Sequence, residues 1–478
     1  MSTVAIVRQR VRAPRWPLMQ VILAHGAGSP SRERLAELAG IGHRTVNNVM
    51  RDLGPKSNHL LASGRPARFG PGAGLALGLS VGSRTVRGGL IDANGDLHHE
   101  HSAAALPMQL KSEPSIVLSR LRAVAAEVLG QALEKGTLLA PGPDRELALL
   151  GAAVAWPSPL DRSKRPGGWG LDPSWKEIDR DLDEVLSIPQ RMASCLGGVF
   201  TVDRCHAIHD VNAHALWLAF HESRIRTIDP ADDSPMWRVG LVLRVSEGLA
   251  ASAMLMAPPD QQRLSFIDSK LIEGTKGFAG EIGHLHLDKR VIDKVNKDQL
   301  AGLARIDYER WTCSCGRRHH LEAFASAPGL MRRLRASDVD IPEDGAGQER
   351  LVERGREGRI DHPLQLRAGT DIGRIIGHAL AGPILMLDPS KITVTGPLAS
   401  ETLVRGIERE GNEWASVIDD SVHIDVDRSG AGEYIGVRGA ALALVRQLVY
   451  RNFLDDKADA GPVTFRVGER EIAALAES

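Results

Sequence analysis

Residues 277–326 constrain the fold more than any other part of the chain, because they carry four side chains that one metal ion could bind. The four are His284, Cys313, Cys315 and His320. Thiolates and neutral imidazoles are the usual ligands of a structural zinc ion, normally four in a tetrahedron. Since His284 and Cys313 are 29 positions apart, a shared metal would close this segment into a long loop.

The alternative is that Cys313 and Cys315 are two reduced, buried thiols beside surface histidines. We favour a metal, because isolated Cys-x-Cys pairs rarely occur with matching histidines. The sequence leaves open whether His319 or His320 completes the set. Glu281 and Glu322 lie next to these ligands, so a metal that holds the loop would also direct two carboxylates into one pocket.

Length and composition indicate an ordinary soluble protein of two to four domains, with 478 residues, 43% of them hydrophobic. Four cysteines argue against a secreted disulfide scaffold and for a reducing cytoplasm. No apolar run approaches the roughly 18 residues that a membrane span needs, and the arginine-rich start lacks an apolar signal core. We therefore expect a cytoplasmic protein with no membrane partner.

The charge is unevenly distributed along the chain. Residues 1–70 carry eleven basic and three acidic side chains, a net charge of +8, which leaves −9 for the rest. A basic end on an acidic body predicts a polyanionic partner for that end alone.

Residues 1–70 also have the pattern of a small helical domain. Three helices are predicted, over 17–25, 31–38 and 43–53, with Ser31 as the cap of the second. A tight turn at 40–42 joins the last two, which is typical of a helix-turn-helix. The third helix buries Val46, Val49, Met50 and Leu53. Its other face supplies the candidate DNA contacts, His43, Arg44, Thr45, Asn47, Asn48 and Arg51.

Residues 60–69 are interpreted as a wing after these helices. Arg65, within a Gly-Arg-Pro triplet, is the candidate for insertion into a narrow A·T minor groove. The alternative is a solvated basic helical hairpin. Charge, turn spacing and wing together favour a double-stranded DNA operator as the partner.

From about residue 73 the pattern changes to β-branched runs alternating with long helical stretches. Strands are predicted over 74–81, 86–91, 147–155, 239–245 and 392–395. Helices are predicted over 116–133, 211–220, 366–387 and 434–449. This alternation indicates an α/β body with mixed sheets. The inserted residues 289–311 are interpreted as a solvated excursion. Cys195 and Cys205 are expected to pack as small apolar side chains.

Two motifs resemble those of the ROK family (repressors, open reading frames and kinases). Residues 280–284 read Gly-Glu-Ile-Gly-His, and residues 313–322 read Cys-Ser-Cys-Gly-Arg-Arg-His-His-Leu-Glu. The family pattern is Gly-Glu-x-Gly-His followed by Cys-x-Cys-Gly-x-x-Gly-Cys-Leu-Glu. His319 therefore stands at the usual glycine and His320 at the third cysteine. In the family, the histidine of the Gly-Glu-x-Gly-His motif, here His284, holds zinc together with the three cysteines. The glutamates and the same histidine contact sugar hydroxyls.

The resemblance covers most of residues 15–450 and implies an N-terminal winged helix-turn-helix followed by a two-lobed, actin-like ATPase body. It places the DNA-binding domain at 1–70. The first lobe would be 71–208, closed by the helix 433–450, and the second 209–432, with the zinc loop 277–326. Residues 451–478 are left as a peripheral C-terminal extension.

The phosphate-binding turns of ROK kinases are degraded in this chain. The kinases' Asp-x-Gly-x-Thr corresponds to Ser-Val-Gly-Ser-Arg at 80–84, and their second glycine-rich turn to Ser-Glu-Gly-Leu-Ala-Ala-Ser at 246–252. Side chains replace glycines, and Glu247 would place a negative charge against phosphate. We expect no kinase activity.

The sugar side of the pattern is better kept. The kinases' Asn-Asp pair, whose aspartate is the base, corresponds to His209 and Asp210. The expected ligand-binding set is His209, Asp210, Glu281, His284 and Glu322. Carboxylates with imidazoles suit polyhydroxylated ligands, because they pair with neighbouring hydroxyls. The competing interpretations are that Asp210 only caps a helix, and that the cleft is purely structural.

The sequence thus predicts a ROK-type transcriptional regulator, a repressor controlled by a sugar or sugar phosphate. Paired operator half-sites would require a homodimer or homotetramer. One alternative is an ATP-dependent, glucokinase-like sugar kinase with an accessory DNA-binding domain. Another is a DNA-bound regulator whose cleft serves only oligomerisation.

Overall fold

The computed structural model describes residues 18, 22, 31–52, 69, 73–82, 85–103, 115–136, 144–165, 187–226, 238–256, 269–298, 302–337, 339, 363–415, 422–450 and 464–477. Most of the predicted wing, including Arg65, and the end of the third predicted helix lie outside these residues. The strands and helices predicted for the body are present with small shifts at their ends.

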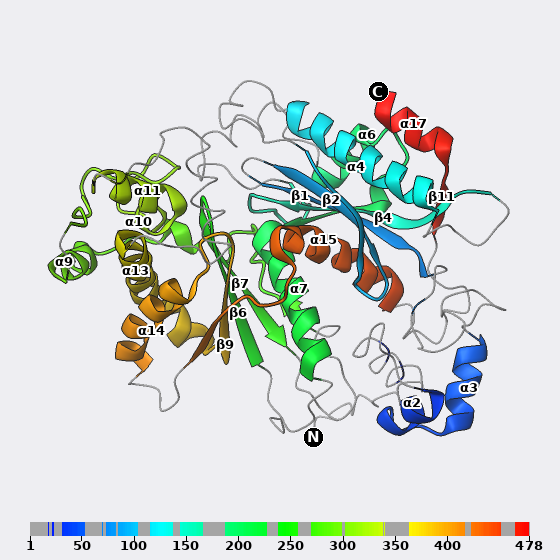
Figure 1. The fold of residues 1–478 in the computed structure, drawn as a ribbon, viewed down its shortest axis with the longest axis horizontal. Coiled ribbons are helices and arrows are strands. Elements are labelled where there is room, and N and C mark those ends of the chain that lie inside the picture. The colour runs from blue at the N-terminus through cyan, green and yellow to red at the C-terminus, as the bar shows by residue number, and fades with distance from the viewer. Residues whose placement is uncertain are drawn as a thin grey trace, which may run out of the picture.

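A mixed sheet forms the centre of the first lobe, in the order β11-β4-β1-β2-β3, with β5 also paired to β4 (Figure 1). Its strands are β1 (Leu75–Val81), β2 (Val86–Asp92), β3 (Leu97–Ser102), β4 (Leu147–Trp156), β5 (Cys205–His209) and β11 (Phe465–Val467). The first three are antiparallel neighbours, and β4 lies parallel to β1 and β5. Every residue of β4 is buried, which explains its unbroken apolar sequence.

The second lobe repeats this arrangement with the order β10-β9-β6-β7-β8. Its strands are β6 (Arg238–Val245), β7 (Leu249–Met256), β8 (Lys270–Leu271), β9 (Lys391–Thr395) and β10 (His423–Val426). Again three antiparallel neighbours are followed by two parallel strands. The turns β1–β2 and β6–β7 are therefore topologically equivalent.

Helices cover both sheets. In the first lobe these are α4 (Ser115–Lys135), α6 (Ile188–Cys195) and α17 (Glu469–Glu477), with α15 (Ile435–Val445) on the sheet's other face. The second lobe has α9 (Lys289–Lys297), α10 (Glu322–Ala325), α11 (Ala327–Arg335), α13 (Pro363–Leu387) and α14 (Glu401–Ala415). No described helix is both long enough and apolar enough to span a membrane.

The helices α7 (Asp210–Arg226) and α15 cross in the middle of the molecule (Figure 1). A Cβ on Gly439 would lie 1.8 Å from the Ala213 carbonyl oxygen, so this close approach requires glycine. Because α7 follows β5 of one sheet and precedes β6 of the other, it connects the two lobes directly.

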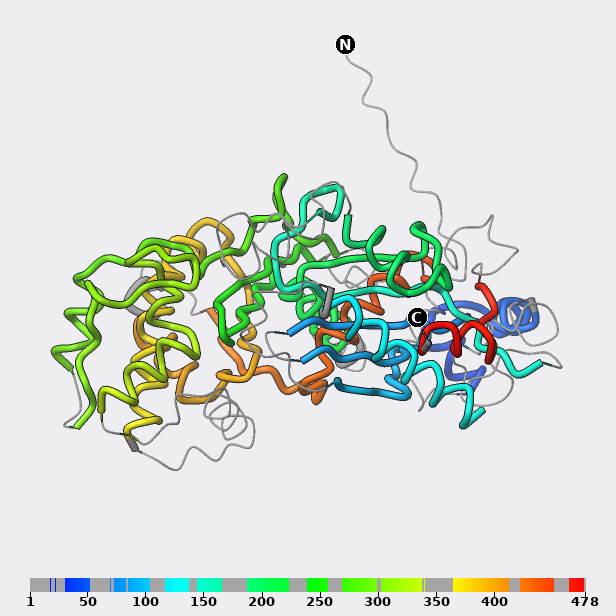
Figure 2. The backbone as a smooth tube through the Cα atoms, turned by 90° about the horizontal axis from the view of Figure 1, so that it is seen from above, coloured from blue at the N-terminus to red at the C-terminus, as the bar shows by residue number. Residues whose placement is uncertain are grey.

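Two short helices, α2 (Arg32–Leu38) and α3 (His43–Asp52), lie at the end of the molecule beyond the first lobe (Figure 2). The Ser31 hydroxyl accepts a hydrogen bond from the Arg34 amide, as expected for the predicted cap. Gly40 has a φ of +62°, which suits the tight turn between the helices. Their apolar residues belong to one buried cluster with residues of α7 and α15.

Two peripheral segments of the sequence prediction are packed into the body instead. In the insertion 289–311, Val291, Ile292 and Val295 of α9 and also Trp311 are buried, so the expected solvated excursion was wrong. Near the C-terminus, β11 adds a strand to the edge of β4, and Leu475 of α17 is buried among residues of α4 and α6. Their apolar residues cover sheet and helix surfaces that would otherwise be exposed to water.

Candidate functional site

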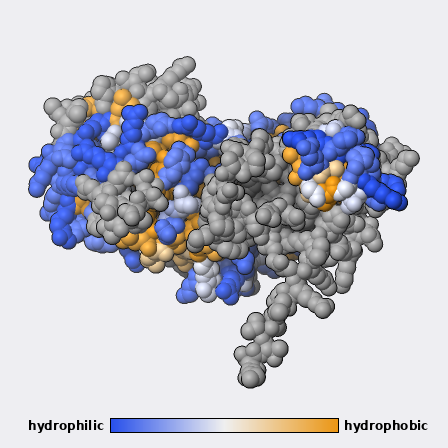
Figure 3. Space-filling model, turned by 90° about the horizontal axis from the view of Figure 1, so that it is seen from below, coloured by the Kyte–Doolittle hydropathy of each residue, from blue (hydrophilic) through white to orange (hydrophobic). Residues whose placement is uncertain are grey.

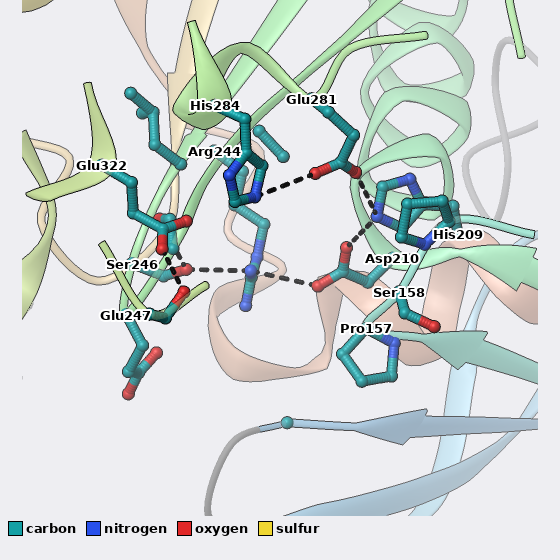
Figure 4. Close-up of a pocket in the computed structure, with 16 residues that line it drawn as sticks. Pro157, Ser158, His209, Asp210, Arg244, Ser246, Glu247, Glu281, His284 and Glu322 are labelled. Carbon is teal, nitrogen blue, oxygen red and sulfur yellow. Dashed lines mark hydrogen bonds and ion pairs between the residues drawn. The ribbon is translucent and has the colours of Figure 1, made fainter. Parts of the chain in front are cut away.

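A polar cleft lies where the ends of β4, β5 and β6 meet residues 277–326 (Figure 4). Its cavity volume is about 160 Å³, room for on the order of ten water molecules. The five residues expected to bind a ligand all line it, namely His209, Asp210, Glu281, His284 and Glu322. The remaining lining residues are Gly82, Pro157, Ser158, Pro159, Arg244, Ser246, Glu247, Gly248, Leu249, Ala250 and Ser314.

An unbroken series of polar contacts runs around the cleft (Figure 4). Glu281 lies 4.0 Å from His284 Nε2 through one carboxylate oxygen and 3.6 Å from His209 Nε2 through the other. His209 Nε2 is also 3.4 Å from Asp210 Oδ1. Arg244 Nη1 is 3.0 Å from Asp210 Oδ2 and donates to Ser246 Oγ at 2.9 Å.

His209 and Asp210 are buried, and their charges are set by their neighbours. Burial lowers the pKa of His209, so its imidazole is neutral at pH 7. Burial alone would raise the pKa of Asp210, but Arg244 and His209 outweigh it and the pKa is lowered. The Val211 amide adds to this effect by donating to Asp210 Oδ1 at 2.7 Å. Asp210 is therefore an ionised hydrogen-bond acceptor and a weakened base.

Glu281 has the opposite electrostatic environment. Burial, together with the nearby carboxylates of Asp210 and Glu322, raises its pKa to about 8. At pH 7 it is mainly a protonated acid that can donate a hydrogen bond. The cleft thus offers a donor and an acceptor, Glu281 and Asp210, on either side of His209.

Glu322, at the start of α10, is fixed from two sides. Its Oε1 accepts hydrogen bonds from Ser314 Oγ at 2.5 Å and from Cys313 Sγ at 3.2 Å. Its Oε2 faces Gly248 and Gly283, where added Cβ atoms would lie 3.1 and 3.2 Å away. Both glycines therefore make room for this carboxylate.

The four candidate metal ligands converge beside the cleft, and their ligand atoms all lie within 4.8 Å of one another. His284 Nδ1 is 3.2 Å from His320 Nδ1 and 3.7 Å from Cys313 Sγ, while Cys315 Sγ is 3.3 Å from His320 Nδ1. Tetrahedral bonds of about 2.0–2.3 Å separate neighbouring ligand atoms by about 3.3–3.8 Å. The donor set fits a tetrahedral metal ion. His284 presents Nδ1 to this set and Nε2 to the cleft.

His319, the other candidate ligand, lies outside the cluster. Its ring stacks on Tyr308 with a centroid distance of 4.2 Å, and its Nε2 is 3.3 Å from Glu309. It has a φ of +64°, a conformation that favours glycine, and the stacking helps to offset that strain.

Comparisons with known proteins bear on this site, since residues 265–447 match the sequence model of the ROK family. The chain contains a ROK family domain. The chain is also 23% identical over 399 residues to "Putative xylose repressor" from Caldicellulosiruptor sp. (strain Rt8B.4), covering 80% of this chain and 82% of that protein.

Solved ROK structures are similar over longer stretches. A ROK family transcriptional regulator, described as a homolog of the E. coli MLC protein, has a TM-score of 0.55 at 16% identity and covers 97% of this chain and 99% of its own. That similarity shows a shared fold. A ROK glucokinase from Streptomyces griseus, solved with glucose and AMPPNP, has a TM-score of 0.48 at 18% identity and covers 78% of this chain and 100% of its own. The function has to be argued from the site.

Sequence reasoning missed three polar residues of the cleft, Ser158, Arg244 and Ser314. Ser314 lies between two recognised cysteines, so its position could have suggested it. Arg244 lies at the end of β6 in one sheet. Its ion-pair partner, Asp210, follows β5 of the other sheet. Only the packing of the two lobes brings these residues together.

The predicted DNA contacts described here lie on one helix, α3. His43, Arg44, Asn48 and Arg51 are exposed, Thr45 and Asn47 are half-buried, and Val46, Val49 and Met50 are buried. Asn47 accepts a hydrogen bond from Arg32 of α2 and contacts His43, which is itself 3.4 Å from Glu33. Arg44 and Asn48 extend the exposed polar face along the helix.

Proposed function

We propose that this protein is a sequence-specific DNA-binding transcriptional regulator of the ROK type, a repressor controlled by a sugar or sugar phosphate in the cleft. The observation that carries the proposal is the exposed polar face of α3, backed by a buried apolar face. In this proposal α2 and α3 are the core of a winged helix-turn-helix, and α3 enters the major groove. Viewed from the side on which α2 and α3 lie, hydrophilic side chains cover much of the described surface (Figure 3).

The α7 helix gives the cleft a physical connection to the DNA-binding end. It begins at Asp210, and Phe220 further along it lies against Gly95 of the β2–β3 turn. In the same turn Asn94 exchanges two hydrogen bonds with the backbone of Phe69, the last residue of the predicted wing. A ligand that displaces the start of α7 would therefore bias the position of the DNA-binding segment.

Three features support a receptor over a kinase. The turn after β6 is closed on itself, since Ser246 donates to the Gly248 carbonyl through both its amide and its hydroxyl. Glu247 brings a negative charge to this turn, and Arg244 occupies the carboxylate that would act as base. ATP-dependent phosphorylation of a sugar by the purified protein would favour the sugar-kinase alternative.

We also propose that His284, Cys313, Cys315 and His320 hold a structural zinc ion. Burial and the Glu322 carboxylate raise the pKa of Cys313 above its usual range, so a nearby cation is needed for it to become a thiolate. When bound, the ion supplies a crosslink between the two ends of the loop. The residues of the loop then keep Glu281 and Glu322 directed into the cleft.

The test is fluorescence anisotropy of the full chain on DNA flanking its own gene, at several salt concentrations. Tight, competitor-resistant binding is expected, and Arg44→Ala should weaken it by about 1–3 kcal/mol. Arg428→Ala, in an exposed ion pair of the second lobe, is the matched control. Weak binding that ignores sequence and disappears at modest salt would refute the regulator. Sedimentation of the DNA-free protein tests for the expected dimer or tetramer.

A further inference from the structure

Arg244 is an unexpected cation in an acidic cleft. Among the described lining residues it is the one lysine or arginine, and it faces four carboxylates, those of Asp210, Glu247, Glu281 and Glu322. Figure 4 shows its guanidinium in the middle of the group, between Asp210 and Ser246.

The charge of Arg244 is neutralised by an ion pair within the protein. Nη1 is 3.0 Å from Asp210 Oδ2 and 2.9 Å from Ser246 Oγ, so the guanidinium is held by one residue from each lobe. Asp210 follows β5 of the first sheet, whereas Ser246 follows β6 of the second. This ion pair leaves no uncompensated cation for a ligand.

The remaining charges disfavour an anion. Counting only Asp210, Glu247 and Glu322 against Arg244 leaves an excess of two negative charges. The candidate metal would not change this balance, because two thiolates and two neutral imidazoles around a divalent ion carry no net charge. A phosphate group in this cleft would meet like charge at short range in a partly desolvated site.

Several polar atoms nevertheless lack a partner among the described residues. Ser158 Oγ, His209 Nδ1 and Arg244 Nε are buried and make no hydrogen bond there. Ser158 and His209 are 5% and 4% exposed, so these atoms have no ready access to bulk water. Buried polar groups of this kind require hydrogen-bonding partners, and hydroxyl groups are neutral ones that both donate and accept.

We propose that the cleft is adapted to an uncharged polyhydroxy ligand and excludes phosphorylated sugars, because Asp210 neutralises the one cation among its described lining residues, Arg244, and the remaining carboxylates leave an excess of negative charge. This inference rests on the proposed ligand-controlled function and narrows it to one class of effector. The same ion pair weakens Asp210 as a base toward a ligand hydroxyl, which suits a site that binds its ligand without activating it.

The test is isothermal titration of the full chain, purified without chelator, with three matched pairs of probes. These are glucose, N-acetylglucosamine and fructose, each beside its own 6-phosphate. At least one uncharged sugar should bind ten times more tightly than its phosphate ester. Arg244→Gln should reduce the affinity for the uncharged sugar at least tenfold. Glu247→Gln should reduce the ratio of the two affinities, uncharged sugar over phosphate ester, about threefold. Arg428→Gln, in an exposed ion pair outside the residues that line the cleft, should change neither the sugar affinity nor the preference over the phosphate ester.

Arg244→Gln leaves Asp210 buried without its partner, so the double variant Asp210→Asn/Arg244→Gln is measured beside it. The double variant keeps the net charge of the cleft, so it should still prefer the uncharged sugar, and loss of that preference would overturn the argument from the excess of carboxylates. A phosphate ester that binds as tightly as its parent sugar would overturn the proposal, as would no binding in any pair up to about 10 mM. DNA binding is measured on the same samples to separate the proposed DNA-binding function from the inference about the ligand. Either of the two can hold when the other fails.

Discussion

The two walls of the cleft differ in how closely they match the ROK kinase motifs. One wall, formed by residues 277–326 with His209 and Asp210, has each of its predicted ligand-binding side chains in a network of polar contacts. The other wall, at the β1–β2 and β6–β7 turns, includes Gly82 and Glu247, and Ser80 lies on β1 just before the first turn. Kinase chemistry needs a carboxylate and a glycine-rich turn at the positions of Ser80 and Glu247. In the proposed regulator, ligand recognition would be retained without phosphate transfer.

The equivalent turns of the two lobes are held differently. In the β1–β2 turn the Gly82 amide donates to the Thr85 carbonyl of its own hairpin, whereas the β6–β7 turn is also bound from outside, by the Ala327 amide at the Ser246 carbonyl. Residues 277–326 contact the same hairpin, as in the hydrogen bond from the Ala251 amide to the Gly280 carbonyl. We expect changes at the candidate metal ligands and at Gly280 to cost more than a change at the half-buried Glu247.

The largest effect is expected from Cys315→Ser, which removes one ligand of the candidate zinc ion. Bound metal should fall well below one ion per chain, and the free energy of unfolding should drop by on the order of 4 kcal/mol. Elemental analysis and chemical denaturation measure the two quantities. Cys195→Ser, in the first lobe, is the control and should leave metal content unchanged. Full occupancy in Cys315→Ser would exclude the four-ligand site.

Gly280→Ala is expected to lower the free energy of unfolding by about 3 kcal/mol, because a strained backbone and a steric clash add. Gly280 has a φ of +98°, and an added Cβ would lie 1.8 Å from the Ala251 carbonyl oxygen. Gly240→Ala on β6 is the matched control, since no heavy atom lies within 4 Å of its added Cβ. Thermal unfolding measures both variants, and equal effects would show that the positive φ and the close contact at Gly280 add no cost.

Ser314→Ala should have a smaller effect, about 1–2 kcal/mol, because it removes one hydrogen bond to the buried Glu322 carboxylate. The metal ligands are untouched, so metal content should stay at the wild-type level. The same variant should weaken ligand binding, since Glu322 loses a fixed orientation. Unchanged stability and unchanged sugar affinity would show that Ser314 does not position Glu322.

Glu247→Gln should be the mildest change, within about 0.5 kcal/mol of wild type in unfolding free energy. Glu247 lies in the turn after β6, and its side chain is half-buried. Its removal should not create ATP-dependent sugar phosphorylation, because Ser80 and the Arg244–Asp210 ion pair remain. Phosphorylation by this variant, measured by product formation, would mean that one charge had silenced an intact kinase.

Local patterns predicted most of the fold. The unbroken apolar run of β4, the Ser31 cap and the periodicity of α4 and α13 each depend on neighbours along the chain. The interpretation failed for α9, β11 and α17, whose sequences are mixed in polarity. Whether such segments are solvated or packed depends on the surfaces they meet, which are distant in sequence.

From the sequence, spacing and residue chemistry predicted the four candidate metal ligands and the polar face of α3, and the resemblance to ROK motifs implied the five expected ligand-binding residues. Only the tertiary structure decided that His320 and not His319 joins the cluster, since that choice depends on the backbone turn at a φ of +64°. It also decided that Arg244 meets Asp210. An ion pair between the ends of two strands in different sheets has no signature in either segment, because its geometry exists only once the lobes have packed.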